Sequence, residues 1–142
     1  MPYSPILVKP MREELVAVGF EELFTPEDVD RVVESKTGTL LVVVNSVCGC
    51  AAGMARPGVR LALQEGPRPD HLSTVFAGQD VEATARARSL FGDIPPSSPS
   101  MALFKEGELV WFLPRHRIEG RDALAVASDL REAFAKHCAV PA

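Results

Sequence analysis

The chain has 142 residues, 46% of them hydrophobic, and its 15 basic and 19 acidic residues leave a net charge of −4. This composition is typical of one globular domain with its own core, which we expect to span residues 1–142. Without a basic cluster or an apolar run of the roughly 20 residues that cross a bilayer, nucleic acid and membranes are excluded as expected partners.

Two helices are predicted in the first 38 residues. The first begins at Pro10, where a proline suits the opening turn of a helix. The second has Thr25 as its N-cap, Pro26 at its first position and acidic residues in its first turn. We therefore expect residues 1–38 to form an N-terminal helical extension to a core of residues 39–138.

A strand predicted at residues 39–45 is the most apolar stretch of the chain. Its sequence, TLLVVVN, does not alternate between apolar and polar residues, which indicates a strand buried on both faces. The sequence Cys48-Gly49-Cys50 follows, and a helix containing Pro57 is predicted from about residue 51 to residue 64. Unpaired N–H groups and the helix dipole favour an anion at a helix start, so a thiolate is favoured at this turn.

The remaining elements alternate between strands and helices. A strand is predicted at residues 72–77, and a helix begins after Gln79-Asp80. The proline-rich residues 95–100 fit neither a helix nor a central strand. A β-hairpin is predicted at residues 101–113, turning at Glu106-Gly107. The last helix begins near residue 120, ends around Cys138, and is expected to pack inward through Leu124, Ala127, Leu130 and Phe134.

The three cysteines, at positions 48, 50 and 138, are too few for a structural disulfide framework. The N-terminal stretch lacks the pattern of a signal peptide, so we expect a cytoplasmic location. Closely spaced cysteines in a cytoplasmic protein favour a catalytic or a metal-binding role.

From residue 39 onward, the predicted order of elements resembles the thioredoxin fold, an α/β fold with a central mixed β-sheet flanked by helices. Four sequence motifs, in order along the chain, resemble those of the bacilliredoxin family, which are thioredoxin-like proteins with a Cys-Gly-Cys site. These motifs are NSVCGCAAGMARP, TVFAGQD, PSSPSMAL and PRHRIEG. The resemblance implies that the Ser98–Pro99 peptide bond is cis.

The resemblance also implies a function. Bacilliredoxins are thiol-disulfide oxidoreductases that reduce mixed disulfides between proteins and the small thiol bacillithiol, and the resemblance extends to disulfide reductase or isomerase activity. The expected partners are bacillithiolated or disulfide-containing client proteins, the low-molecular-weight thiol as co-substrate, and a reductase that resets the site. No bound cofactor or metal is expected.

The two cysteines of the motif have distinct expected roles. Cys48 comes first out of the strand and is expected to be the nucleophile, while Cys50 resolves the mixed disulfide by closing a Cys48–Cys50 bond. Gly49 permits the sharp bend between them. The ring closed by the Cys48–Cys50 disulfide is smaller than that of a Cys-X-X-Cys site, and strain makes a disulfide easier to reduce. We therefore expect the dithiol to be a weaker reductant than thioredoxin. The alternative is two buried, chemically inert cysteines in a turn.

Two further segments are expected to line a substrate groove with Gly49. Ser98, Pro99 and Ser100 form its opposite wall, although the serines are equally suited to a turn. Hairpin geometry brings Arg115 and His116 to the same edge of the sheet. Either cation favours a thiolate on the nucleophile, and Arg115 suits a carboxylate of bacillithiol. The alternative is a solvated polar loop.

Two rival functions come from other classes of protein. Cys48, Cys50, His137 and Cys138 nominally offer a ligand set for zinc or copper, but cysteines one residue apart depart from the usual spacing of zinc ligands. The predicted distance to Cys138, which we expect to be a bystander, also weakens that set. The other rival is a non-catalytic adaptor on a thioredoxin-like scaffold.

Overall fold

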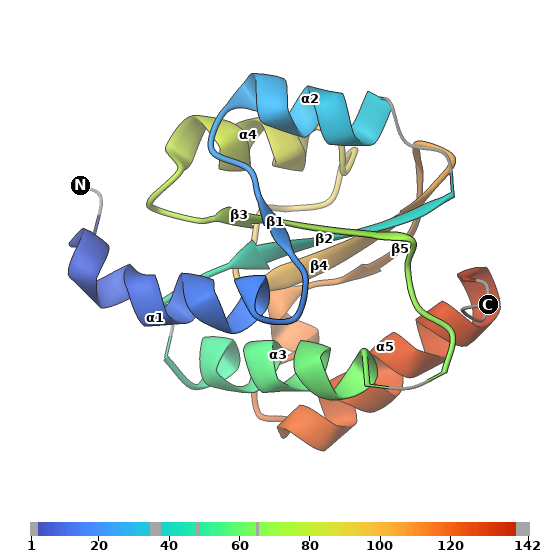
Figure 1. Cartoon of the computed structure of the whole chain (residues 1–142). Coiled ribbons are helices and arrows are strands. Elements are labelled where there is room, and N and C mark those ends of the chain that lie inside the picture. The colour runs from blue at the N-terminus through green and yellow to red at the C-terminus, as the bar shows by residue number, and fades with distance from the viewer. Residues whose placement is uncertain (1–2, 35–37, 48, 65, 139–142) are drawn as a thin grey trace.

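The computed structural model describes residues 3–34, 38–47, 49–64 and 66–138 (Figure 1). Five strands in these residues form one sheet in the order β1-β3-β2-β4-β5. Their bounds are Glu21–Glu22 for β1, Thr39–Asn45 for β2, His71–Phe76 for β3, Ser100–Lys105 for β4 and Glu108–Leu113 for β5. β3 runs parallel to β1 and β2, whereas β4 is antiparallel to both β2 and β5, so the predicted mixed sheet is confirmed.

Helices cover both faces of this sheet. Figure 1 shows α2 and α4 on one face and α3 and α5 on the other, with α1 beside α3. The helices span Pro5–Val16 for α1, Pro26–Glu34 for α2, Gly49–Ala62 for α3, Val81–Ser89 for α4 and Ala123–His137 for α5. A short 3-10 helix, η1, covers Arg115–Arg117. α1 is the N-terminal helix. β1 pairs with β3 in the sheet, and α2 lies with α4 over one face of it.

β2 is the centre of the molecule. All seven of its residues are buried, as the unbroken apolar run predicts. Because successive side chains of a strand point to opposite faces, Leu41 and Val43 join the core under α3 and α5, and Leu40, Val42 and Val44 join the core under α2 and α4. The turn toward α3 therefore continues from a strand that is buried along its whole length.

The structure corrects four expectations about individual elements. α1 begins at Pro5 rather than Pro10. The helix continues through Pro10, although this proline has no N–H to donate to the Ile6 carbonyl, because both residues are exposed and water can bond that carbonyl instead. α3 begins at Gly49, two residues before its predicted start. β1 was not expected, because two glutamates carry no strand signal. Leu124, expected in the core, is 70% exposed.

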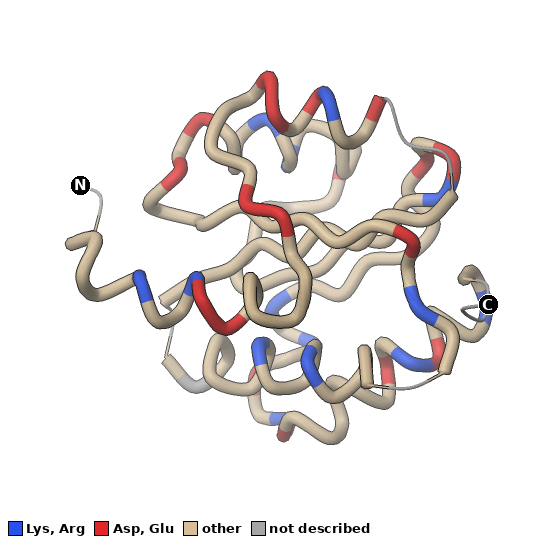
Figure 2. Tube along the Cα trace, viewed as in Figure 1, with Lys and Arg blue, Asp and Glu red and all other residues tan. Residues whose placement is uncertain are grey.

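Charges are mixed along the described part of the chain. In Figure 2, basic segments and an acidic segment lie along the same helix, α1. No helix in the described residues is both long and apolar enough to cross a membrane.

Candidate active site

Three segments that are distant in the sequence meet at one edge of the sheet. β2 pairs with β4 so that Val44 lies opposite Ser100, and β4 pairs with β5 so that Met101 lies opposite Leu113. The carboxyl end of β2, the amino end of β4 and the carboxyl end of β5 therefore share an edge. The described residues that continue from them are 46–47 and 49, 97–99 and 114–117, so both hairpin ends lie at the edge of the sheet that was predicted.

The first segment is the turn between β2 and α3. The Gly49 N–H donates to the Val47 carbonyl at 2.7 Å. The φ angle of Gly49 is +51°, in the left-handed region that favours glycine, and a Cβ there would meet nothing within 4 Å. Gly49 is thus required for backbone conformation rather than for space. Cys48 lies outside the described residues, and Cys50 is in the first turn of α3.

The second segment is the loop before β4. Its Ser98–Pro99 peptide bond is cis, as predicted. Pro99 and Ser100 are buried, and the Ser100 hydroxyl donates to the Ser97 carbonyl at 3.0 Å. The side chain of Ser100 therefore closes the loop, in agreement with the turn-forming alternative. Ser98 is half-buried.

The third segment follows β5, and Arg115 joins it to the loop. The Arg115 backbone N–H donates to Ser97 Oγ at 3.2 Å, and Arg115 Nη1 donates to the Ser98 carbonyl at 3.1 Å. Its Nε donates to Glu119 at 2.9 Å. The guanidinium thus braces the backbone next to Pro99, a contact that the sequence did not indicate.

A cavity of about 360 Å³ lies between the loop and the segment after β5. Apolar and polar side chains from both segments line it: Ile94, Pro95, Pro96, Ser97, Pro114, Arg115, His116 and Glu119. His116 is exposed. The cavity is therefore lined by an imidazole, a guanidinium and a carboxylate together with apolar, proline-rich residues.

Arg88, at the end of α4, is a second cation at this loop that sequence reasoning missed. Its Nη2 donates to the Ser97 carbonyl at 3.3 Å. Burial lowers the pKa of Arg88 from its ordinary value. Two guanidinium groups, from α4 and from η1, therefore hold consecutive carbonyls of the loop. An arginine inside a helical pattern gave no signal of this role.

Asn45 and Ser46 lie in a buried polar cluster behind the turn. Each is 2% exposed. Asn45 Oδ1 accepts the Ser46 N–H at 2.9 Å, and its Nδ2 donates to the Met11 carbonyl of α1 at 3.1 Å. Helix α1 is thereby joined to the chain just before Cys48.

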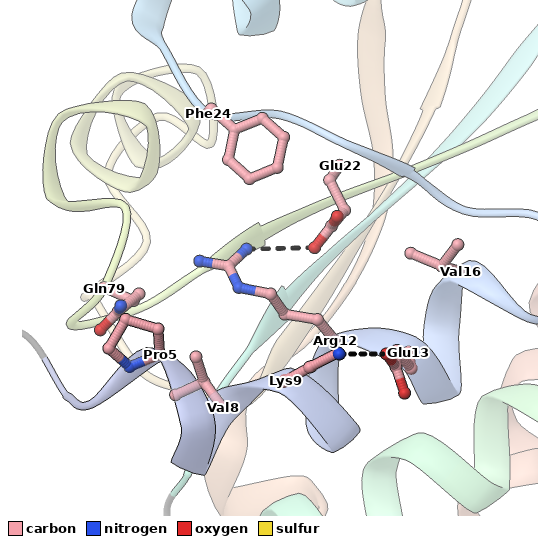
Figure 3. Close-up of a pocket in the computed structure, with 9 residues that line it drawn as sticks. All are labelled: Pro5, Val8, Lys9, Arg12, Glu13, Val16, Glu22, Phe24 and Gln79. Atoms are coloured by element: carbon pink, nitrogen blue, oxygen red, sulfur yellow. Dashed lines mark hydrogen bonds and ion pairs between the residues drawn. The ribbon is translucent and has the colours of Figure 1, made fainter.

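A larger cavity, of about 410 Å³, lies between α1, β1 and the loop after β3 (Figure 3). Arg12 crosses it and makes ion pairs with Glu22 at 3.1 Å and Asp80 at 3.0 Å. Its guanidinium also lies over the rings of Phe24 and Phe76, 5.4 and 5.1 Å from their centroids. These two carboxylates balance the charge of Arg12, and the pair with Glu22 of β1 links α1 to the sheet.

Cys138 lies far from the turn. Its thiol hydrogen-bonds Thr39, the first residue of β2, whereas the turn follows the last residue of that strand. At about 3.3 Å per residue, the ends of β2 are roughly 20 Å apart. Cys138 and its neighbour His137 are therefore poorly placed to complete a metal site with the Cys-Gly-Cys turn, and the described residues hold no other cluster of three such ligands.

Comparisons with known proteins agree with this architecture. Residues 3–138 match the family described as disulphide isomerase. A bacilliredoxin from Bacillus cereus is 57% identical over 137 residues, covering 96% of this chain and 95% of that protein. A bacilliredoxin from Salinibacter ruber is 52% identical over 140 residues, covering 97% and 81%.

Solved structures of thioredoxins have the same fold at low identity. Thioredoxin from Fasciola hepatica superposes with a TM-score of 0.57 and 17% identity, covering 83% of this chain and 99% of that one. Thioredoxin from Malassezia sympodialis gives a TM-score of 0.58 and 15% identity, covering 85% and 92%. The fold is therefore that of thioredoxin, and the extent and identity of the sequence matches show that the chain belongs to the bacilliredoxin family.

Proposed function

We propose that this protein reduces mixed disulfides between client proteins and bacillithiol through Cys48 and Cys50. The observation that carries the proposal is the turn itself, in which a glycine in the left-handed conformation links the end of a buried strand to the start of a 14-residue helix. The family and the fold support a thiol-disulfide oxidoreductase, and the names of the relatives point to bacillithiol.

The proposed reaction has two exchanges. The Cys48 thiolate attacks the bacillithiol sulfur of the mixed disulfide, and the client leaves as a thiolate that takes a proton from water. The Cys50 thiolate then attacks the Cys48 sulfur, closing the Cys48–Cys50 disulfide and releasing bacillithiol. A separate reductase supplies two electrons and two protons to restore both thiols. The N–H groups at the start of α3 favour the attacking thiolate.

The loop before β4 and the cavity beside it supply the proposed substrate site. Pro99 has no N–H, so the backbone next to it is open to pairing with an extended client chain. The cavity between the loop and η1 is proposed to receive the part of bacillithiol that carries the carboxylates. His116 gives that cavity an N–H group suited to anions, while Arg115, already bonded to Glu119 and to the Ser98 carbonyl, supports its wall.

Mass spectrometry of single-cysteine variants tests this function. Cys48→Ala and Cys50→Ala, each combined with Cys138→Ala, are incubated with a bacillithiolated protein. We expect a bacillithiol adduct on Cys48 in the Cys50→Ala variant, with the client thiol freed, and no adduct in the Cys48→Ala variant.

The controls distinguish the rival classes. Cys138→Ala alone is expected to react as the wild-type chain does. If neither variant forms an adduct and the wild-type cysteines stay reduced, the proposal is wrong. Stoichiometric zinc or copper in the purified protein would then indicate metal binding, and unchanged behaviour of Cys48→Ser in every redox assay would indicate an adaptor.

A further inference from the structure

Arg56 lies two turns into α3, directly behind the turn that carries the cysteine motif. Its side chain is only 10% exposed, which is rare for an arginine because burying a charge costs free energy unless partners surround it. The partners of Arg56 come from two distant parts of the chain, helix α1 and the end of β2 with the residue that follows it. This placement is not explained by the packing of α3, whose other inward positions are small and apolar.

One arm of the guanidinium holds the chain just before Cys48. Arg56 Nη1 donates to the Ser46 carbonyl at 2.8 Å and to Asn45 Oδ1 at 3.1 Å. Asn45 Oδ1 also accepts the Ser46 N–H, so the N–H and the carbonyl of Ser46 both have side-chain partners. Ser46 is two residues before Cys48 in the sequence, and the direction of its carbonyl therefore sets the path of the chain into the turn.

The other side of the guanidinium reaches the N-terminal helix. Arg56 Nε pairs with the Glu14 carboxylate of α1. Asn45 contacts the same helix through its bond to the Met11 carbonyl. Two polar links therefore join α1 to the turn, about one helical turn apart along α1.

Resting on the function proposed above, we propose that Arg56 is a positioning residue for thiol exchange and that Glu14 makes helix α1 a working part of the redox site. The guanidinium holds the Ser46 carbonyl in place as the turn passes between its dithiol and disulfide states. Its positive charge also favours an anion at the turn, and the carboxylate of Glu14 sets its orientation.

The variant Arg56→Lys separates the effect of the positive charge from the effect of the hydrogen-bond geometry. A lysine side chain keeps the positive charge but ends in a single ammonium group instead of a planar fork. It is unable to hold the Ser46 carbonyl and the Glu14 carboxylate with two nitrogens in fixed relation. Glutamine at the same position removes the charge as well.

The experiment measures Cys48 in full-length variants. Arg56→Gln, Arg56→Lys and Glu14→Gln are compared with two matched controls on the same helices, Arg60→Gln and Glu13→Gln, both at exposed positions. Each change is made in the wild-type chain and in a Cys50→Ala, Cys138→Ala background. Circular dichroism and urea unfolding report folding. The readouts are the pH profile of Cys48 alkylation by iodoacetamide and the rates of reduction of an aromatic disulfide and of a bacillithiolated protein.

We expect Arg56→Gln to move the midpoint of the alkylation profile upward by about one pH unit, roughly a tenfold slower reaction at pH 7. Arg56→Lys should keep most of that midpoint while losing about tenfold in disulfide exchange. Glu14→Gln should slow exchange without raising the midpoint. Both controls should stay within about twofold of the wild-type chain.

Results for folded variants decide between the roles. If folded Arg56→Gln has the alkylation profile and exchange rates of Arg60→Gln, the proposal is wrong. If Arg56→Gln does not fold, Arg56→Lys and Glu14→Gln decide in its place, and control-like behaviour in both overturns the proposal. A Cys50→Ala, Cys138→Ala chain that forms no bacillithiol adduct contradicts the proposed function alone, because the alkylation profile still tests Arg56.

Discussion

At the scale of single residues, Cys138 shows how the position of a thiol governs its chemistry. The thiol is half-buried beside Thr39, and burial raises the pKa of Cys138 above its ordinary value. A raised pKa means that the reactive thiolate forms only at higher pH. Cys138 is therefore expected to be inert under conditions in which Cys48 reacts.

This expectation is tested in the Cys48→Ala, Cys50→Ala variant, in which Cys138 is the one remaining cysteine. Iodoacetamide at pH 8 should alkylate the folded protein several-fold more slowly than the same chain in urea. The difference should narrow as the pH rises. Equal rates in the folded and unfolded chains at pH 8 would contradict a buried, protonated thiol.

Arg115 supports a different prediction because its side chain is already engaged with the protein. Arg115 Nη1 holds the Ser98 carbonyl, so Arg115→Ala should loosen the loop that we propose as the contact for disulfide substrates. We expect reduction of a bacillithiolated protein and of a simple aromatic disulfide to slow by similar factors, about tenfold. Arg117→Ala, two residues away and exposed, is the control. A loss confined to the bacillithiolated substrate would instead assign Arg115 to carboxylate recognition.

At the scale of elements, the contact between α3 and α5 depends on a glycine. A Cβ at Gly58 would lie 2.7 Å from Val126 Cγ1 and 3.2 Å from the Ala123 carbonyl oxygen. Val126 is fully buried, so any shift of its side chain must be accommodated inside the packed core. The close approach of the two helices thus requires the absence of a side chain at position 58.

We expect Gly58→Ala to lower the free energy of unfolding by about 1–3 kcal/mol, the usual cost of overpacking a core. Gly53→Ala is the matched control on the same helix, because a Cβ at Gly53 meets nothing within 4 Å. That change should be neutral or stabilising by up to about 1 kcal/mol, since alanine favours a helix. Urea unfolding measures both, and a Gly58→Ala variant as stable as the wild-type chain would refute the packing argument.

The start of α2 is a capping box formed by Thr25 and Asp28. The Asp28 N–H donates to Thr25 Oγ1 at 3.1 Å, and the Asp28 carboxylate accepts the N–H groups of Phe24 at 3.1 Å and of Thr25 at 3.3 Å. The pKa of Asp28 lies below its usual range, chiefly because the Phe24 N–H donates to its carboxylate. Burial opposes this shift, and the bonds with Thr25 add to it. The predicted N-cap at Thr25 is confirmed.

A lowered pKa in the folded state fixes the sign of the pH dependence. The carboxylate of Asp28 stabilises the fold above the unfolded pKa, about 3.9, and this contribution is lost as the pH falls through the folded pKa. Asp28→Asn should therefore be less stable than the wild-type chain at pH 7, and the difference should shrink at pH 3. Urea midpoints at both pH values measure it, with Glu27→Gln as the control. A difference independent of pH would contradict this account.

At the scale of the whole molecule, local sequence patterns predicted the sheet core but not its polar contacts. The run Leu40–Val44 specified a buried strand, and Glu106-Gly107 specified the hairpin, because both signals lie within a few neighbouring residues. The partners of Arg56 are distant in the sequence, and nothing near that residue marks it as buried. β1 exists only because β3 offers it an edge, so its strand conformation is imposed by tertiary structure.

The same reasoning applies to the candidate site. The cis Ser98–Pro99 bond was predicted because the motif that carries it resembles that of one family. The bracing of the loop by Arg88 and Arg115 was not, because a guanidinium that binds a backbone carbonyl leaves no complementary residue type in the sequence. Backbone acceptors are present at every position, so they carry no sequence signal.

The central place of β2 has a consequence for the slow motions of the molecule. This strand is hydrogen-bonded on both sides, to β3 and β4, and is buried throughout, so its amide protons should be among the last to exchange with deuterated water. Exchange-coupled mass spectrometry should find residues 41–45 far better protected than residues 114–117. The rim of the site would then open by local fluctuations, while the strand beneath it opens only with global unfolding. The proposed cycles of oxidation and reduction would thus leave the scaffold intact.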